Sequence, residues 1–403
     1  MRKSLTRVVL TWACLCVQMI SIDNVHATAS PDDLIKPYVA ANLLYDNNVL
    51  RLPKGKPFPE GKSSKGDFVK TVNAGVEMDW RPSRQQVIIK ADVNHSWFQN
   101  FDSLDYLGWN VLAEWNWKIG SDLEGTFGYS NTQRLNEYDQ INELTSNESN
   151  FSVYRANIAY LFHPQGRIAI NYFRTEDEFE EGSRKSSNLT EDNAELNLEY
   201  LSPTGSSLGV RILATVGDYP NRQYSGRVDE LDNGFLRMEY GMTYRWVWSE
   251  KTRIYGRVGY AQQDFDHQSF KNFGDVTAQL NIDWAVTEQT GILFSAWREI
   301  RQVDDKNESF SLSQGVKITP SWQVTPKFKM YSDLSFEQKD YEVSSNKGNQ
   351  RKDNLWSIGY NLAYEPFHNI IFDLMLGYEN KGSNERFKSY ESLSTGLNMQ
   401  VVF

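Results

Sequence analysis

Apolar and polar residues alternate along most of the chain, in segments of roughly ten positions that each end in a turn. In residues 71–80 every second residue from Val72 to Trp80 is apolar, and the residues between them are polar or glycine. A period of two places the two sets on opposite faces of a strand, whereas a helix would scatter both around its circumference. The pattern therefore predicts β-strands that each have one apolar and one polar face.

Eighteen segments show this pattern. The weakest lie at 123–130, 168–174 and 290–299, which leaves sixteen strands as the alternative count. With an even number of strands, the last strand ends on the same side of the membrane as the first strand begins. The approximate spans are 35–45, 68–80, 86–98, 106–118, 122–131, 151–162, 167–175, 193–201, 207–217, 235–248, 252–263, 275–287, 290–299, 309–319, 327–337, 354–365, 369–379 and 390–403.

The connections between these segments alternate in length. Short ones such as 81–84 and 202–205 are followed by long polar ones such as 46–67, 131–150 and 338–353. Outer-membrane barrels have short periplasmic turns and long extracellular loops. We therefore expect an all-β fold, a transmembrane antiparallel up-and-down β-barrel of about eighteen strands.

Aromatic residues gather near the ends of the predicted strands, on the apolar face, where barrels place rings at the water–lipid boundary. The alternative is a soluble β-sandwich or barrel with buried aromatics. It is disfavoured because nearly every strand has a polar face, and a soluble barrel of this size would have a very wide interior to fill. The aromatic set is Trp80, Trp97, Trp115, Trp117, Tyr160, Phe162, Tyr200, Trp246, Trp248, Trp284, Tyr364 and Tyr378.

Composition excludes several other classes. A mean hydropathy of -0.57 over 403 residues does not fit a helical membrane protein, which needs about 20 apolar residues per span. A net charge of -10 argues against nucleic-acid binding, which depends on Lys and Arg at phosphates. An aromatic content of 13% argues against disorder.

The N-terminus has the features of a secretory signal. Basic residues precede an apolar stretch from Val8 to Ile22, and small residues follow near Ala27. We expect residues 1–27 to be removed and residues 28–403 to form a single barrel domain in the outer membrane of a Gram-negative cell; a retained anchor is the alternative. Both cysteines, Cys14 and Cys16, lie in the signal, so the mature chain has no disulfide and no thiolate metal site.

The residues indicate no enzyme, metal or cofactor. The five histidines are isolated from one another, and no metal-ligand spacing or nucleophile motif occurs. His95 and Ser96 are the one adjacent Ser/His pair, but alternation places His95 on the lipid face and Ser96 on the lumen face. Neighbouring residues on opposite faces cannot act together.

Function should lie in the lumen. Alternation assigns Arg211, Arg237, Arg245 and Arg257 to one inner wall, because they come from three consecutive strands. The opposite part of the ring, from Asp283 to Glu379, is mostly acidic. Such walls would set up a transverse field that favours anionic solutes on the arginine side, and lumen aromatics could stack on sugars. The complete set of predicted pore-lining residues is Arg155, Arg211, Arg237, Arg245, Arg257, Glu195, Glu199, Glu239, Asp283, Asp333, Asp373, Tyr255 and Tyr331.

A simpler interpretation of the same residues is structural. Arg237 with Glu239, or Arg211 with Glu195 or Glu199, would pair across neighbouring strands, and any water-filled barrel needs a polar wall. Few residues precede the first strand after cleavage, so we expect no plug domain and no energy-coupled receptor.

The first strand carries a resemblance. The run from Pro37-Tyr38 through Tyr45-Asp46-Asn47-Asn48 to Leu50-Arg51-Leu52 resembles the opening of the EpsL-like outer-membrane barrels of exosortase-associated exopolysaccharide operons, part of a wider group of barrel porins. Asn47 stands where that family more often has an acid. The resemblance implies passage of a secreted polysaccharide and partners among periplasmic and inner-membrane synthesis proteins.

Three functions remain from the sequence. The first is a non-enzymatic outer-membrane channel that exports exopolysaccharide. The second is a general porin or one for oligosaccharide uptake. The third is a structural or adhesive barrel that acts through its surface loops. The expected partners are outer-membrane lipid and a polysaccharide or oligosaccharide, with no nucleic acid.

Overall fold

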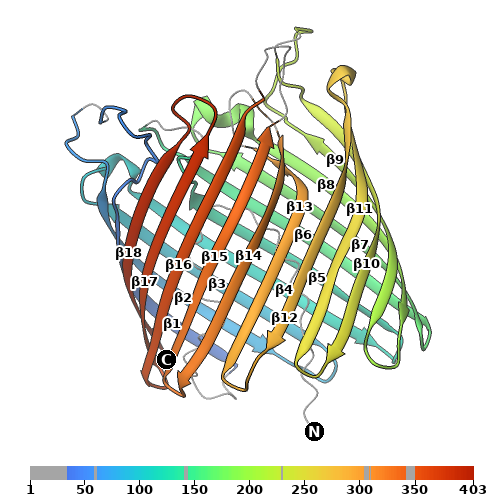
Figure 1. Ribbon diagram of the computed structural model, residues 1–403. Helices are drawn as coiled ribbons and strands as arrows, with labels where there is room; N and C mark the ends of the chain where they lie inside the picture. The colour runs from blue at the N-terminus through green and yellow to red at the C-terminus, as the bar shows by residue number, and fades with distance from the viewer. Residues whose placement is uncertain are drawn as a thin grey trace.

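The protein is a closed antiparallel β-barrel, seen here in a computed structural model that describes residues 34–58, 61–139, 144–227, 230–303, 308, 310–341 and 350–403 (Figure 1). The predicted signal peptide lies outside these residues. Short 3-10 helices occur in the long loops at Asp102–Leu104, Gly182–Ser187 and Ser269–Lys271. The described residues contain eighteen strands: β1 (Ile35–Asp46), β2 (Asp67–Trp80), β3 (Gln86–Phe98), β4 (Tyr106–Ile119), β5 (Leu123–Leu135), β6 (Glu148–His163), β7 (Gly166–Phe179), β8 (Leu189–Leu201), β9 (Ser207–Asp218), β10 (Gly234–Ser249), β11 (Thr252–Phe265), β12 (Phe273–Ala285), β13 (Thr290–Gln302), β14 (Phe310–Thr325), β15 (Phe328–Tyr341), β16 (Lys352–Phe367), β17 (Ile370–Ser383) and β18 (Tyr390–Val402).

Each strand pairs antiparallel with the next along the chain, and the ring closes where β1 pairs with β18. The closing register runs from Tyr38 opposite Val402 to Asp46 opposite Ser394. The predicted up-and-down topology and the count of eighteen are confirmed, and the three weakest segments are the strands β5, β7 and β13. Closure leaves no unpaired edge, the condition for strands to cross a bilayer.

Large apolar side chains cover the outside. Trp80 is 50% exposed, Ile170 59% and Leu397 59%, at positions that alternate with polar residues facing inward. Soluble monomers rarely expose apolar area on this scale, so the outer surface is suited to acyl chains. A soluble barrel that buries its aromatic residues is therefore excluded.

Outward aromatic residues gather near the ends of the strands. Trp80 of β2, Trp115 of β4 and Trp246 of β10 are exposed near the short-turn end, and Trp97 of β3 is exposed near the long-loop end. Outer-membrane barrels carry such aromatic girdles on both sides of their apolar band. The predicted position of aromatics near strand ends is confirmed.

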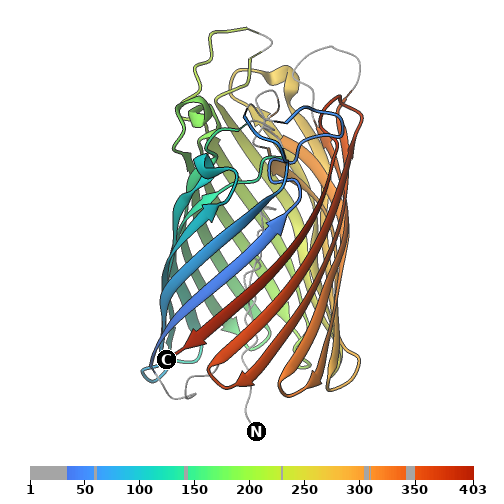
Figure 2. The same ribbon diagram turned by 90° about the vertical axis from the view of Figure 1, so that its left-hand side faces the viewer.

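The two ends of the barrel differ, as the connection lengths predict. Short turns close one end, with Gly120 (φ 62°) and Gly205 (φ 84°) in the left-handed conformation that glycine adopts without a Cβ clash. Long loops gather at the other end, while β1 begins and β18 ends at the short-turn end (Figure 2). Among the described residues, no helix is long and apolar enough to cross a membrane.

Candidate functional site

The strand register places the predicted pore-lining residues on the inner face. Arg245, for example, lies between the outward Tyr244 and Trp246 and is directly opposite Tyr255 on β11. Their role in solute passage remains a prediction. The inward set contains Arg155, Arg211, Arg237, Arg245, Arg257, Glu195, Glu199, Glu239, Asp283, Asp333, Asp373, Tyr255 and Tyr331.

Acids neutralise most of the arginine wall on β9–β11. The Arg211 guanidinium lies between two carboxylates, with Nε 2.6 Å from Glu195 Oε2 and Nη1 2.6 Å from Glu239 Oε1. Its side chain is only 5% exposed. Arg257 Nη2 lies 3.3 Å from Glu299 Oε2 on β13. Paired charges of this kind hold neighbouring strands in register and contribute little net field to the lumen.

Arg237 does not pair with Glu239, so that part of the pairing prediction is wrong. Glu239 is engaged by Arg211, and Arg237 lies nearer the long-loop end, where its Nη2 is 3.5 Å from Glu191 Oε1. Among the described residues, Arg155 and Arg245 have no carboxylate partner, so the uncompensated positive charge of this set lies there.

The acidic arc is also partly compensated. Asp333 Oδ1 lies 3.0 Å from Lys317 Nζ, Asp283 pairs with Arg253, and Asp373 accepts a hydrogen bond of 3.1 Å from Asn398. The difference in net charge between the arginine wall and the acidic arc is therefore smaller than a count of arginines and acids predicts.

The long-loop end contains an apolar cluster that the sequence did not reveal. Leu50 and Leu52 of the β1–β2 loop are 0% and 3% exposed and pack with Phe101 and Leu104 of the β3–β4 loop. Tyr138, from the β5–β6 loop, belongs to the same cluster. Loops from three hairpins thus fold toward one another over the mouth instead of extending into solvent.

The β5–β6 loop has internal hydrogen bonds. Asn136 N donates to Asn147 O at 2.9 Å, and Asn147 Nδ2 donates to Glu137 O at 2.9 Å. The Tyr138 hydroxyl donates to Thr145 O at 2.7 Å. These bonds join the described residues on the two sides of the loop. Because β5 extends to Leu135 and β6 begins at Glu148, the connection is shorter than the predicted 131–150.

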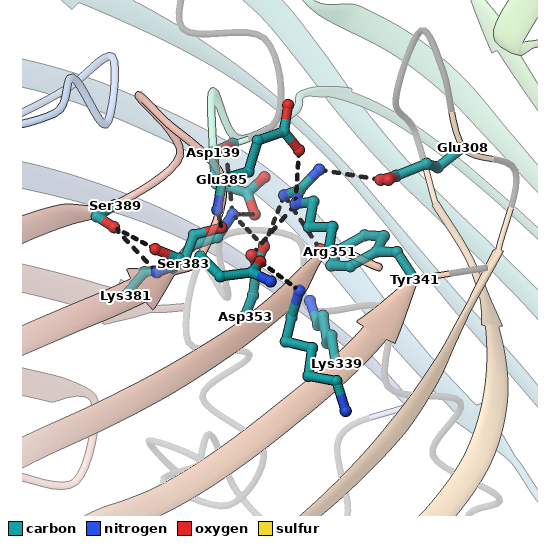
Figure 3. Close-up of polar contacts among 12 residues, drawn as sticks. Asp139, Glu308, Lys339, Tyr341, Arg351, Asp353, Lys381, Ser383, Glu385 and Ser389 are labelled. Carbon is teal, nitrogen blue, oxygen red and sulfur yellow. Dashed lines mark hydrogen bonds and ion pairs between the residues drawn. The ribbon is translucent and has the colours of Figure 1, made fainter. Parts of the chain in front are cut away.

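This loop reaches a distant part of the wall (Figure 3). Lys381 on β17 donates from Nζ to Asp139 O at 3.2 Å and lies 3.3 Å from Asp139 Oδ2. Five strands, β4, β3, β2, β1 and β18, lie between β5 and β17 along the ring. The loop therefore spans part of the mouth and is held at its far side by a buried ion pair.

The wall beneath Asp139 is a compact charged network (Figure 3). Asp353 on β16 lies 3.3 Å from Lys381 Nζ and receives two bonds from Arg351, at 3.2 and 2.6 Å. Arg351 also lies 3.1 Å from Glu308 and stacks over the Tyr341 ring at 3.9 Å. Bidentate and stacked guanidinium contacts fix the position of both partners.

Glu137, beside Asp139 in the same loop, has an unusual environment. Burial and the nearby Glu379 carboxylate raise the pKa of Glu137 to about 8, although Arg51 and Lys339 oppose the rise. Arg51 also pairs with two other acids, with Nη1 2.6 Å from Asp46 Oδ2 and Nε 3.3 Å from Glu379 Oε2. At neutral pH the docked loop therefore holds a protonated Glu137.

Sequence reasoning missed this network at the mouth. Its members come from loops and strand ends in which alternation ceases, and Asp139 and Lys381 are 242 positions apart. The length of the 131–150 connection was the one sequence signal that pointed to it. Among the described residues, no group of three or more His, Cys, Asp or Glu side chains is arranged to hold a metal ion.

Comparison with known proteins agrees with the fold. A family model described as "Putative beta-barrel porin 2" matches residues 217–403, from the end of β9 to the last residue. The second half of the chain is thus similar to barrel porins. No curated protein matches the sequence.

Several solved structures are similar to this chain at low sequence identity. OccAB3 of Acinetobacter baumannii has a TM-score of 0.46 and 8% identity, covering 92% of this chain and 99% of that one. The outer membrane protein opdK of Pseudomonas aeruginosa has a TM-score of 0.48 and 10% identity, with coverages of 92% and 98%. OccK2 (OpdF) of P. aeruginosa, solved with glucuronate, has a TM-score of 0.49 and 8% identity, with coverages of 92% and 98%.

Proposed function

We propose that this protein is an outer-membrane channel for saccharides whose mouth is narrowed by the β5–β6 loop. The observation that carries the proposal is the contact between Asp139 and Lys381, which holds a loop across the mouth of a barrel with a polar inner wall. A barrel that served only as an anchor for surface loops would have no use for a loop folded inward over its lumen.

The inner wall supports a hydrophilic solute. Inward positions carry hydroxyl, amide, carboxylate and guanidinium groups, with single aromatic residues such as Tyr255 and Tyr331 between them. Saccharides exchange hydrogen bonds with water for bonds with such groups and present apolar C–H faces to rings. Paired charges on both walls favour neutral or weakly charged solutes over strongly anionic ones.

A narrowed mouth favours uptake of short saccharides, since an extended polymer would require the loop to move. Export of a secreted exopolysaccharide is the second candidate. It is favoured by the resemblance of residues 37–52 to the EpsL-like barrels. In this segment Arg51 lies against Asp46 and Glu379 at the mouth. Under either candidate, residues 1–27 would direct the chain to the outer membrane, and periplasmic synthesis proteins would be partners only in export.

Two experiments test the proposal. Purified barrel in planar bilayers should conduct ions, and a neutral oligosaccharide should interrupt the current; a barrel that never conducts would refute the channel. Deletion of the gene separates the two directions. Impaired growth on an oligosaccharide supports uptake, whereas loss of surface polysaccharide with normal growth on sugars supports export.

A further inference from the structure

One side of the inner wall carries a row of polar side chains around an aromatic ring. Tyr38 on β1, Gly75 on β2, Asp92 on β3 and Asn110 on β4 are directly opposite one another in successive strand pairs. They therefore lie side by side across four strands, on the face that looks into the lumen. The apolar cluster of the mouth begins at Val69, nearer the long-loop end of β2, so the row lies beneath it.

Gly75 allows the Tyr38 ring to lie over β2. A Cβ at this position would be 2.6 Å from Tyr38 Cζ and 2.7 Å from the Asp92 Cβ, so any larger residue would displace the ring. The Tyr38 hydroxyl lies at the Asp92 end of the ring, since a Cβ on Gly75 would be 2.7 Å from the Tyr38 hydroxyl oxygen as well as from the Asp92 Cβ. The result is a flat, half-buried ring whose polar end adjoins a carboxylate.

The carboxylate is oriented by two amides. Asn73 Nδ2 and Asn110 Nδ2 both donate to Asp92 Oδ2, each at 3.0 Å. Since both bonds reach the same oxygen, Oδ1 remains for a solute. An acceptor held in this way is pre-organised, which lowers the entropy lost when a ligand binds.

The same patch contains acceptors that lack donors. Within the described part of the chain, the Oδ1 atoms of Asn73 and Asn94 are buried and receive no hydrogen bond. Asn94 is only 4% exposed and lies against Gly108, where a Cβ would be 2.8 Å from its Oδ1. Both atoms have almost no accessible surface, so a solute in the lumen does not reach them in this conformation, and the subsite depends on Tyr38 and Asp92.

We propose that Tyr38, Asn73, Asp92 and Asn110 form a binding subsite for a neutral saccharide unit on the inner wall below the mouth, with Tyr38 near the short-turn end of β1. The proposal rests on the proposed function, because it assumes that saccharides enter the lumen. The ring takes a C–H face of the sugar, and the carboxylate and amides take vicinal hydroxyls. Nearby Glu77 is already paired with Lys90 at 3.0 Å, so Asp92 dominates the local charge and disfavours acidic sugars.

Binding is measured by titration calorimetry on the purified barrel in detergent, with maltohexaose and a galacturonate hexamer as probes. We expect maltohexaose to bind more tightly. Asp92→Asn preserves the shape but removes the charge, so it should weaken maltohexaose binding about tenfold while strengthening galacturonate binding. Tyr38→Leu should weaken maltohexaose binding by a similar factor.

Asn281→Ala is the matched control, because it removes an inward amide from β12, on a different part of the wall. Its affinity should stay within about twofold of the wild type, since no subsite contact is lost. Heat-modifiable electrophoretic mobility verifies that each variant is folded. If Asp92→Asn does not fold, Asp92→Ala is measured in its place. The subsite is refuted if the wild type binds neither sugar, if Asp92→Asn leaves the preference unchanged, or if the control is equally impaired. Binding with no conductance would refute the channel alone, and conductance with no binding would refute the subsite alone.

Discussion

Protonation of Glu137 should control how firmly the β5–β6 loop closes the mouth. In the docked loop this carboxyl is surrounded by Glu379 of β17, Arg51 of the β1–β2 loop, Lys339 of β15 and Asp139 of its own loop. Once the loop leaves the wall, water solvates Glu137 and its pKa returns toward the ordinary value of 4.5. The docked state therefore binds a proton that the released state gives up.

The direction and size of the effect follow from linkage. Because the docked pKa of Glu137 is raised to about 8, its contribution to docking is fully present below pH 4.5 and is lost as the pH rises through 8. Between these limits the docking equilibrium constant falls about tenfold for each pH unit. A change from pH 5 to pH 7 should thus favour the released loop by about a hundredfold.

Single-channel recordings at pH 5, 6 and 7 measure this as a rise in open probability with pH. Glu137→Gln stays neutral at every pH, so it should remove the slope and keep the loop docked at pH 7. Glu288→Gln, which removes an exposed carboxylate from a short turn, is the control and should retain the wild-type slope. An open probability that is independent of pH in the wild type, or a slope that survives in Glu137→Gln, would refute the reasoning.

Four further predictions concern the charged residues of the barrel and its outer surface. Lys381→Met removes the ammonium that holds the loop and should raise the open probability about tenfold or more. Lys352→Met, which changes an exposed side chain, should not raise it. Equal effects of the two variants would contradict the role of the Lys381–Asp139 contact in holding the loop. Arg155→Gln should reduce the anion preference measured from reversal potentials, and a larger change from Arg211→Gln would show that the paired arginine also contributes to the field. Arg211→Gln should instead lower the free energy of unfolding by about 3–5 kcal/mol in denaturant titrations, because two buried carboxylates lose their partner; an unchanged midpoint would disprove this. Ile170→Lys, on the lipid face, should cost about 2–4 kcal/mol in the same assay, and a neutral result would mean that this position does not face acyl chains.

The fold could be predicted because it depends on local information. Within each strand the period of two assigns every side chain to a face, and the apolar face can be recognised from residues such as Val72 and Trp80 without knowledge of any partner strand. The antiparallel order then follows from the short turns. For this reason even a weak segment such as 290–299 is a strand in the structure, β13 (Thr290–Gln302).

The mouth could not be predicted because its contacts join distant parts of the chain. Alternation shows that Lys381 is near a strand end, but nothing around it indicates that a loop from β5–β6 will supply its acceptor. The ion pairs within the lumen could not be predicted for the same reason. Arg211 has acids on both neighbouring strands, and only the register and the side-chain directions decide that Glu239 joins it and not Arg237.

The loops at the mouth are held by two different kinds of contact, and this difference determines which part can move. The β1–β2 loop is fixed by Leu50 and Leu52 in the apolar cluster, a contact that pH and ionic strength hardly alter. The β5–β6 loop shares that cluster through Tyr138 and the partly buried Leu144, while the residues on either side of Tyr138, Glu137 and Asp139, face charged groups. Since charged contacts weaken with salt and with deprotonation of Glu137, release should begin at these two residues, with the β1–β2 loop remaining as the fixed rim against which the β5–β6 loop opens and closes.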